Sequence, residues 1–211
     1  MDFNRYDFRG DPNTGMFAAT NSELMLSPQG FEPDLGLETV DCRIAGTGFV
    51  GMFAASGPEG FLLPDVVRER ELESLRDTGA EFSVMESRDT ALGNLVLSNS
   101  SGAYASPALS NKQQQIEEAL GVPVEFGTVG GVPSPGACGV ANGRGAVLHR
   151  EASESEAEKV KEVLELEQVD IGTINTGSPF VGGGAVVQGE RVVTGENTSG
   201  PEIGRLDRTL G

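Results

Sequence analysis

The hydrophobic and polar positions of the chain repeat five times, at intervals of 36 to 46 residues. Each repeat begins at a glycine, continues as a strand of small residues, turns through a short polar segment and returns as a second apolar strand. The opening glycines are Gly15, Gly51, Gly93, Gly136 and Gly182. A period of this length is typical of an array or a closed ring of structural units. The repeat therefore predicts the architecture of the whole chain.

Four of the five repeats continue into an amphipathic helix. Apolar residues at helical spacing predict helices over residues 64–76, 111–120, 154–166 and 201–210. Three capping boxes predict where helices start, because a serine hydroxyl and the side chain three residues later satisfy the first backbone N–H groups. These are Ser110 with Gln113, Ser153 with Glu156, and Ser199 with Glu202. The first repeat contains Pro33 between two glycines and leaves room for a short helix at most.

Each repeat ends in a further alternating strand, near residues 40–44, 82–84, 122–126 and 169–171. Residues 3–8 read as an opening strand, which we expect to complete the last repeat. One unit is therefore three strands and a helix. We expect a single closed domain over residues 1–211, an α/β fold with five pseudo-symmetric blades, in which glycine and alanine face a crowded axis.

The chain is strongly acidic, with 32 Asp and Glu against 15 Lys and Arg and a net charge of −17. Such a chain repels phosphate backbones, which argues against a DNA-binding protein. Either the acidity adapts the surface to molar salt, or it forms a patch for a basic partner. Because the acidic residues are spread along the whole chain, we favour the cytoplasm of a halophile.

Nothing in the chain predicts a membrane segment or a secretion signal. No apolar run approaches the roughly 20 residues needed to cross a bilayer. The first residues, MDFNRYDFRGD, are polar and charged and lack the apolar stretch of a signal peptide. We expect a cytoplasmic protein.

We predict no metal site and no cofactor. The two cysteines, Cys42 and Cys138, are far apart, and the single histidine, His149, does not complete a recognised ligand spacing. Each cysteine lies in a predicted apolar strand, so we expect buried free thiols.

Several short motifs carry a family resemblance. Residues 91–94 read ALGN, residues 145–149 read GAVLH, residues 60–64 read GFLLP and residues 198–202 read TSGPE. Together with the five repeats, they resemble the pentein fold and, within it, the archaeal translation initiation factor 6 family. Arg150 stands where the family's turn has proline, and the fifth repeat has lost the proline altogether.

The resemblance implies an anti-association factor that works by obstruction and not as an enzyme. Such factors bind the large (50S) ribosomal subunit beside a ribosomal protein near the sarcin–ricin loop, with some rRNA contact. They prevent premature joining of the small (30S) subunit, in ribosome biogenesis or in initiation of protein biosynthesis. We expect the chain to act as a monomer, without DNA or membrane partners.

The residue after each opening glycine is a candidate for the ribosome-binding surface. In a five-bladed ring these residues cluster at one mouth of the axis, and Asn94, inside ALGN, is the strongest single candidate. They are Met16, Met52, Asn94, Ala137 and Gly183. The alternative is that they only start strands and are chosen for packing.

Two other functions stay open. Pentein enzymes that hydrolyse guanidino compounds use a cysteine and a histidine, which Cys138 and His149 would supply. Those enzymes, however, place the cysteine in the last repeat, where this chain has none. The second possibility is a scaffold for some other basic partner.

The halophile interpretation predicts that the fold depends on salt. As KCl falls from molar concentration to about 0.1 M, repulsion among the acidic residues is less screened and the protein should unfold. Far-UV circular dichroism across that range measures the loss, and an unchanged spectrum would contradict the interpretation.

Overall fold

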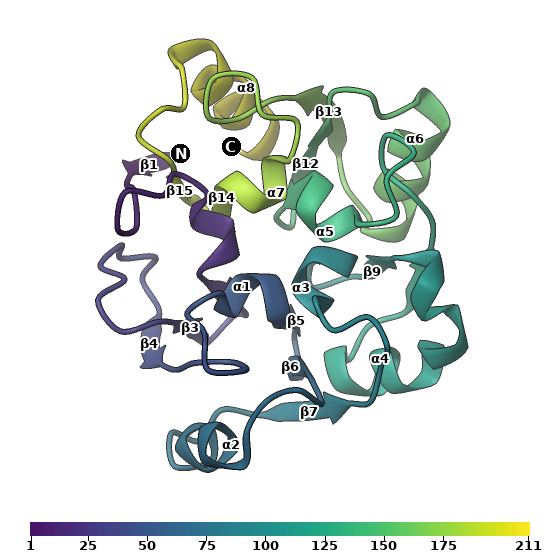
Figure 1. Cartoon of the computed structure of the whole chain (residues 1–211). Helices are drawn as coiled ribbons and strands as arrows, with labels where there is room; N and C mark the ends of the chain where they lie inside the picture. The colour runs from purple at the N-terminus through teal and green to yellow at the C-terminus, as the bar shows by residue number, and fades with distance from the viewer.

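The computed structural model describes residues 1–211 as five three-stranded sheets, or blades, arranged around a central axis (Figure 1). Blade 1 contains β2 (Ala19–Thr20), β3 (Leu24–Ser27) and β4 (Glu38–Asp41), and blade 2 contains β5 (Ala55–Gly57), β6 (Gly60–Pro64) and β7 (Phe82–Met85). Blade 3 contains β8 (Val96–Ser98), β9 (Ala103–Ala105) and β10 (Val124–Phe126), and blade 4 contains β11 (Gly139–Ala141), β12 (Gly145–His149) and β13 (Gln168–Gly172). Blade 5 contains β14 (Ala185–Gln188), β15 (Arg191–Thr194) and β1 (Asp2–Arg5).

All five blades share one topology. The first two strands form an antiparallel hairpin, and the third strand adds to the second in parallel. In blade 5 that third strand is β1, which pairs with β15 from Asp2 opposite Arg191 to Arg5 opposite Thr194. The start of the chain thus completes the last blade, as predicted. β1 ends at Arg5 and not at the predicted Phe8, because Phe8 pairs with Asp11 across a tight turn.

The apolar core is divided into five clusters, and each one spans a junction between neighbouring blades. Leu62 and Met85 of blade 2, for example, pack with Val96 and Ala103 of blade 3. The cluster at the closing junction joins Met25 of blade 1 to blade 5. Five junctions for five blades leave no side of the ring open, which confirms the closed arrangement.

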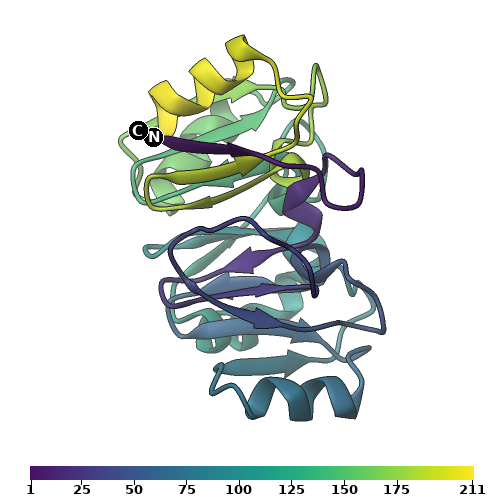
Figure 2. The ribbon, with the colours of Figure 1, turned by 90° about the vertical axis from the view of Figure 1, so that its left-hand side faces the viewer.

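Helices cover the outer side of four blades (Figures 1 and 2). They are α2 (Glu69–Arg76), the 3-10 segment η2 (Pro107–Lys112) with α4 (Gln113–Leu120), α6 (Glu154–Val163) and α8 (Gly200–Leu210). α2 begins five residues later than predicted because Pro64 still belongs to β6 and pairs with Met85. Blade 1 has no helix, and Phe31 and Leu35 of the connecting loop are buried in its place.

The opening glycines do not lie in strands, so this part of the sequence prediction was wrong. They lie in short helical turns: η1 (Thr14–Met16), α1 (Val50–Phe53), α3 (Leu92–Leu95), α5 (Pro135–Cys138) and α7 (Val181–Gly184). The chain must cross here from the outer strand of one blade to the inner strand of the next. One helical turn makes that change of direction, as the hydrogen bond from Ala54 N–H to the Val50 carbonyl shows (2.8 Å).

The five glycines form a closed ring around the axis. A Cβ atom added to Gly51 would overlap the backbone carbonyl oxygen of Gly15, and one added to Gly93 would overlap that of Gly51. The same relation continues through Gly136 and Gly182 and returns to Gly15. Each glycine is therefore required because the backbone of the preceding blade fills the space of a side chain.

Two of the three predicted capping boxes are present. Ser153 and Ser199 each start a helix and pair with Glu156 and Glu202, respectively. The box at Ser110 was wrong, because the helical segment already starts at Pro107 and Ser110 lies inside it.

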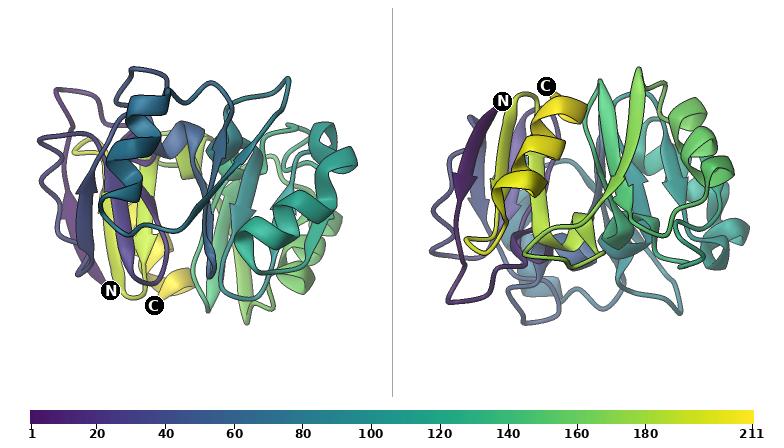
Figure 3. Two further views of the ribbon diagram at one scale, coloured as in Figure 1. Left: turned by 90° about the horizontal axis from the view of Figure 1, so that it is seen from below. Right: turned by 90° about the horizontal axis from the view of Figure 1, so that it is seen from above.

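The axis has two different ends, which Figure 3 shows from the side. The short-helix end carries η1, α1, α3, α5 and α7. The hairpin end carries the turns between the first two strands of each blade, together with both chain termini (Figure 3).

The ring of glycines yields a direct test. Gly93→Ala should destabilise the protein by more than about 3 kcal/mol, because the new methyl group overlaps backbone that cannot move alone. Gly204→Ala is the matched control, because its Cβ would meet nothing within 4 Å and it lies inside α8. We expect the control to gain about 0.5–1 kcal/mol from helix propensity. Equal stability of the two variants in chemical unfolding at constant KCl would refute the packing argument.

Candidate functional site: the two ends of the propeller axis

The structure brings the five predicted surface residues together at the short-helix end. Each occupies the third position of its short turn, and each is half-buried. Neighbouring turns contact one another around the whole ring. These residues are Met16, Met52, Asn94, Ala137 and Gly183. They lie within helical turns and not at strand starts, so the predicted clustering is present although the predicted local structure was wrong.

A tight turn precedes most of the short helices. Ala45 and Gly46 have φ angles of 55° and 77°, and Gly130 and Gly131 have φ angles of 66° and 72°. Two successive residues in the left-handed region are typical of a type I′ turn. The flanking residues pair as isolated bridges, Ile44 with Thr47 and Val129 with Val132. These turns fix the direction in which the chain enters the short-helix end.

A glutamate at the start of an outer helix holds three of these turns. In blade 5, Glu202 accepts hydrogen bonds from the Ser199 N–H (2.8 Å) and the Gly177 N–H (2.9 Å). It also accepts one from the Thr173 hydroxyl (2.7 Å). The same carboxylate therefore caps α8 and fixes the turn that leads into α7.

The same arrangement recurs in blades 4 and 2. Glu156 accepts from the Ser153 N–H (2.8 Å) and the Gly131 N–H (3.0 Å). Glu71 accepts from the Arg68 N–H (2.9 Å) and from the N–H of Gly46 (2.7 Å). The sequence predicted the capping half of two of these contacts. It missed the Glu71 box, because arginine is not a side-chain N-cap.

The hydrogen bonds change the acidity of two of these carboxylates. Burial by itself would raise the pKa of Glu202, but the bonds from Ser199, Thr173 and Gly177 outweigh burial and lower the pKa to about 2. The pKa of Glu156 is lowered to about 2 by the same balance. Both groups therefore stay ionised in the folded protein at any ordinary pH.

At the hairpin end, asparagine side chains join neighbouring blades. Asn99 Nδ2 donates to the Asn142 carbonyl (3.1 Å) and to the Leu164 carbonyl (2.8 Å) just after α6. Asn142 repeats the pattern with Gly189 (3.1 Å) and Leu210 (2.8 Å). These amides fix the positions of the turns at this end.

A cavity of about 400 Å³ runs along the axis between the two ends. The glycine ring and small residues such as Ala54 and Gly139 line it, and the hairpin turns with Asn21, Asn99 and Asn142 surround it. None of the lining side chains is charged.

Both cysteines are free and buried, as predicted. Their predicted location in strands was wrong, because Cys42 directly follows β4 and Cys138 ends α5. Burial raises the pKa of Cys138 to about 11, with a smaller contribution from the Glu156 charge. Burial likewise raises the pKa of Cys42 to about 12. The His149 side chain is 7% exposed, and its Nδ1 accepts a hydrogen bond from the Glu151 N–H (3.1 Å). A protonated, enclosed thiol does not suit a nucleophile.

Neither metal binding nor a membrane span finds support in the geometry. No group of three or more His, Cys, Asp or Glu side chains is placed to hold a metal ion. None of the helices has the length and apolar character to span a bilayer.

The profile of the eIF-6 family matches residues 3–209. The chain belongs to the eIF-6 family. Translation initiation factor 6 of Haloquadratum walsbyi is 38% identical over 98% of this chain and 96% of its own length. The proteins of the same name from Methanosarcina mazei and Methanocaldococcus jannaschii are 33% and 31% identical, over 93% and 97% of this chain, and cover 93% and 96% of their own lengths.

Membership of the eIF-6 family confirms the resemblance drawn from the repeats and the short motifs. The five-bladed arrangement is consistent with the pentein-like fold of that family. The family is one of translation initiation factors, which places the chain in protein biosynthesis. The Haloquadratum relative comes from a halophile, which supports the salt-adapted origin inferred from composition.

The lowered pKa of Glu202 predicts how the stability of the fold depends on pH. In the unfolded chain Glu202 has an ordinary pKa near 4.3. Because folding lowers that pKa to about 2, the carboxylate stabilises the fold fully above about pH 5, and this contribution disappears as pH falls towards 2. Glu202→Gln should therefore lower the free energy of unfolding at pH 7 by on the order of 2 kcal/mol and flatten its decline between about pH 5 and 2.

The control for this experiment is Glu158→Gln, an exposed position on α6. It should leave both the stability and its acid dependence unchanged, measured by chemical unfolding at fixed KCl. Parallel pH profiles for Glu202→Gln and the unmodified protein would contradict the assigned role of Glu202.

Proposed function

We propose that this chain binds the large (50S) ribosomal subunit and prevents its premature association with the small (30S) subunit. The observation that carries the proposal is the match to translation initiation factors over residues 3–209. The closed ring supports it, because a rigid body fixed on the joining face obstructs a second subunit without any chemical step. In this proposal the protein acts as a monomer in the cytoplasm, during ribosome biogenesis or before initiation, and is not an enzyme.

The contact is made mainly to a ribosomal protein near the sarcin–ricin loop, with limited contact to rRNA. The net charge of −17 supports this division, because a strongly acidic chain is repelled by phosphate. Such a chain can bury uncharged side chains against a protein surface without bringing its acidic residues close to phosphate.

We place the docking surface at the short-helix end, around Met16, Met52 and Asn94. Methionine offers adaptable apolar contact, and the asparagine amide adds a polar one. Ala137 and Gly183 complete the ring and leave space for a partner's side chains. All five are half-buried, which leaves part of each available for contact.

The hairpin end is the competing surface, because its charge suits a basic protein. Glu59 and Glu190 are exposed and lie in the hairpin turns of blades 2 and 5. Glu23 lies in the corresponding turn of blade 1 and is also exposed. Matched substitutions at the two ends therefore determine which one binds the subunit.

The function is tested by co-sedimentation with purified large subunits from a halophilic archaeon in molar KCl, followed by addition of small subunits. We expect the protein to pellet with the large subunit and to reduce the amount of joined ribosomes. If it stays in the supernatant, the proposed function is lost and only the fold and family remain.

Matched variants then locate the surface. Met52→Glu and Asn94→Arg should each weaken binding about tenfold or more, as expected for residues near the centre of an interface. Glu59→Lys and Glu190→Lys are the corresponding changes at the hairpin end and should leave binding within about twofold. The reverse result would move the docking surface to the hairpin end while leaving the function intact.

A further inference from the structure

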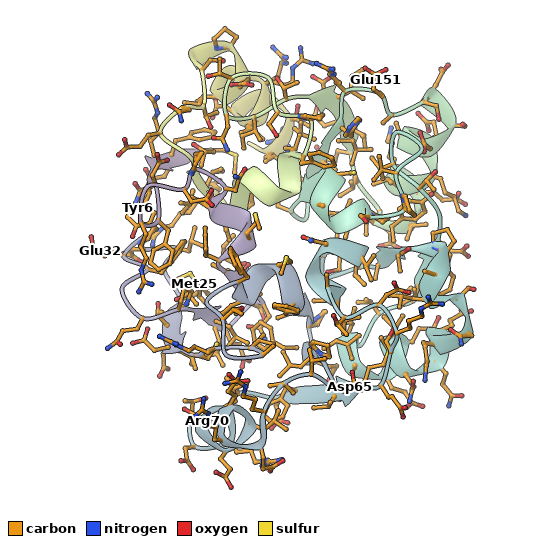
Figure 4. The ribbon with its side chains drawn as sticks, in the orientation of Figure 1. Tyr6, Met25, Glu32, Asp65, Arg70 and Glu151 are labelled. Carbon is orange, nitrogen blue, oxygen red and sulfur yellow. The ribbon has the colours of Figure 1, made fainter.

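The part of each blade nearest the axis is free of charge. Although the chain has 47 Asp, Glu, Lys and Arg residues, none occurs in five long stretches that contain the short helical turns. These stretches are residues 12–22, 44–58, 90–111, 126–143 and 171–189. The labelled charged side chains of Glu32, Asp65, Arg70 and Glu151 lie instead towards the margin of the view down the axis (Figure 4). The backbone nearest the axis therefore carries no charged side chain of its own. At the short-helix end these uncharged residues form a neutral disc, whose turns are reached from the outer side by the carboxylates of Glu71, Glu156 and Glu202 and by the Arg68 guanidinium.

In blades 4 and 5 the whole segment between the outer strand and the short helix is uncharged. The segments that lead into α5 and α7, residues 126–134 and 171–180, contain no charged residue, whereas the corresponding segments of blades 1, 2 and 3 contain charged residues, among them Arg9, Asp11, Arg43, Arg88 and Asp89.

Phe180 is the most exposed large apolar side chain of the molecule. Its exposed fraction is 45%, against 44% for Val84 and 42% for Val66. It directly precedes α7, and its Cβ is the nearest neighbour that a Cβ on Gly183 would meet, at 3.9 Å. Phe180 thus lies next to the ring of five candidate residues.

The ring of Phe180 is held in place from one side. It packs edge-on against His149, with ring centroids 5.7 Å apart and an interplanar angle of 67°. His149 is itself fixed, because it is 7% exposed and bonded through Nδ1 to the Glu151 N–H. An aromatic side chain that is exposed on one side and immobilised on the other loses little conformational entropy when a partner covers it.

We propose that Phe180 anchors the docking surface and that its partner is an uncharged apolar patch on a protein. This inference rests on the proposed function and names a contact residue beyond the five positions next to the opening glycines. The centre of a protein interface is depleted of charge, enriched in aromatic residues and methionine, and surrounded by a polar rim. Phe180 with Met16 and Met52 inside the charged margin has that composition.

The charge pattern also decides between classes of partner. RNA phosphates or a basic tail would be met by free charged groups. The neutral disc carries none of its own, and the carboxylates of Glu71, Glu156 and Glu202 that reach its turns already accept hydrogen bonds from backbone N–H groups. In molar KCl, where the screening length is about 3 Å, charge pairing contributes little and apolar burial keeps its strength. The neutral disc therefore provides the kind of contact that persists in the salt to which the chain is adapted.

The test uses Phe180→Ser and purified large ribosomal subunits in the co-sedimentation assay. We expect the dissociation constant to rise about tenfold or more, because Phe180 would fill an apolar pocket at the centre of the interface. The matched control is Val84→Ser, which removes an equally exposed apolar side chain from the outer strand of blade 2. Thermal unfolding of both variants establishes that each one folds, and Phe180→Leu, which keeps an apolar group, should recover most of the affinity.

A second measurement separates apolar from charged contact. Binding of the unmodified protein should stay constant or tighten between about 1 M and about 3 M KCl. Binding that weakens steadily with salt would overturn the proposed chemistry.

Unchanged binding by folded Phe180→Ser, with binding lost in Met52→Glu, would remove Phe180 as the anchor and leave the proposed function standing. Absence of binding by the unmodified protein would remove the function and this inference together.

Discussion

The whole structure depends on how closely five backbone segments approach one axis. At each junction an opening glycine lies against the carbonyl oxygen of the preceding one, and the ring returns from Gly182 to Gly15. The absence of a side chain at these positions sets the distance between blades. That distance in turn lets the apolar clusters form between adjacent sheets, so that each blade buries its faces against its neighbours and not within itself. A side chain added at the axis therefore also disturbs the apolar packing between adjacent blades.

Much of this arrangement could be predicted because periodicity, which a sequence records directly, is its main determinant. The five repeats, the outer helices and the completion of blade 5 by β1 all follow from the spacing of glycines and apolar residues. The sequence failed where the local conformation is set by contacts between distant segments. The glycines were expected in strands because nothing near them in the chain reveals that the backbone must turn to reach the axis. Ser110 has the local pattern of a cap, but Pro107 starts the helical segment earlier.

The candidate surface shows the same limit. The sequence shows that Met16, Met52 and Asn94 occupy the same position in their repeats. In a ring of repeats this is enough to place them together at one end of the axis. The sequence does not reveal Phe180, whose importance comes from its exposure and its packing against His149, a residue 31 positions away. The sequence does contain one indication of this surface, the long stretches without charge in an otherwise acidic chain. Similarly, Glu71, Glu156 and Glu202 could not be assigned to the turns that they hold, because those turns precede the helices by about 25 residues.

The pairing of β1 with β15 has a consequence for how the protein forms during its own synthesis. β1 must wait for β15, a partner that is made about 190 residues later. Blades 1 to 4 contain only strands that are close in the chain and can assemble as they emerge, since domains tend to fold from the N-terminus. The fifth sheet brings together the two most distant parts of the chain, and contacts of such long range are slow to form. Blade 5 is therefore the only sheet whose strands come from both ends of the chain. Because blade 5 contributes to the apolar clusters at both of its junctions, completion of this one sheet by β1 links the two ends of the chain to the closure of the ring.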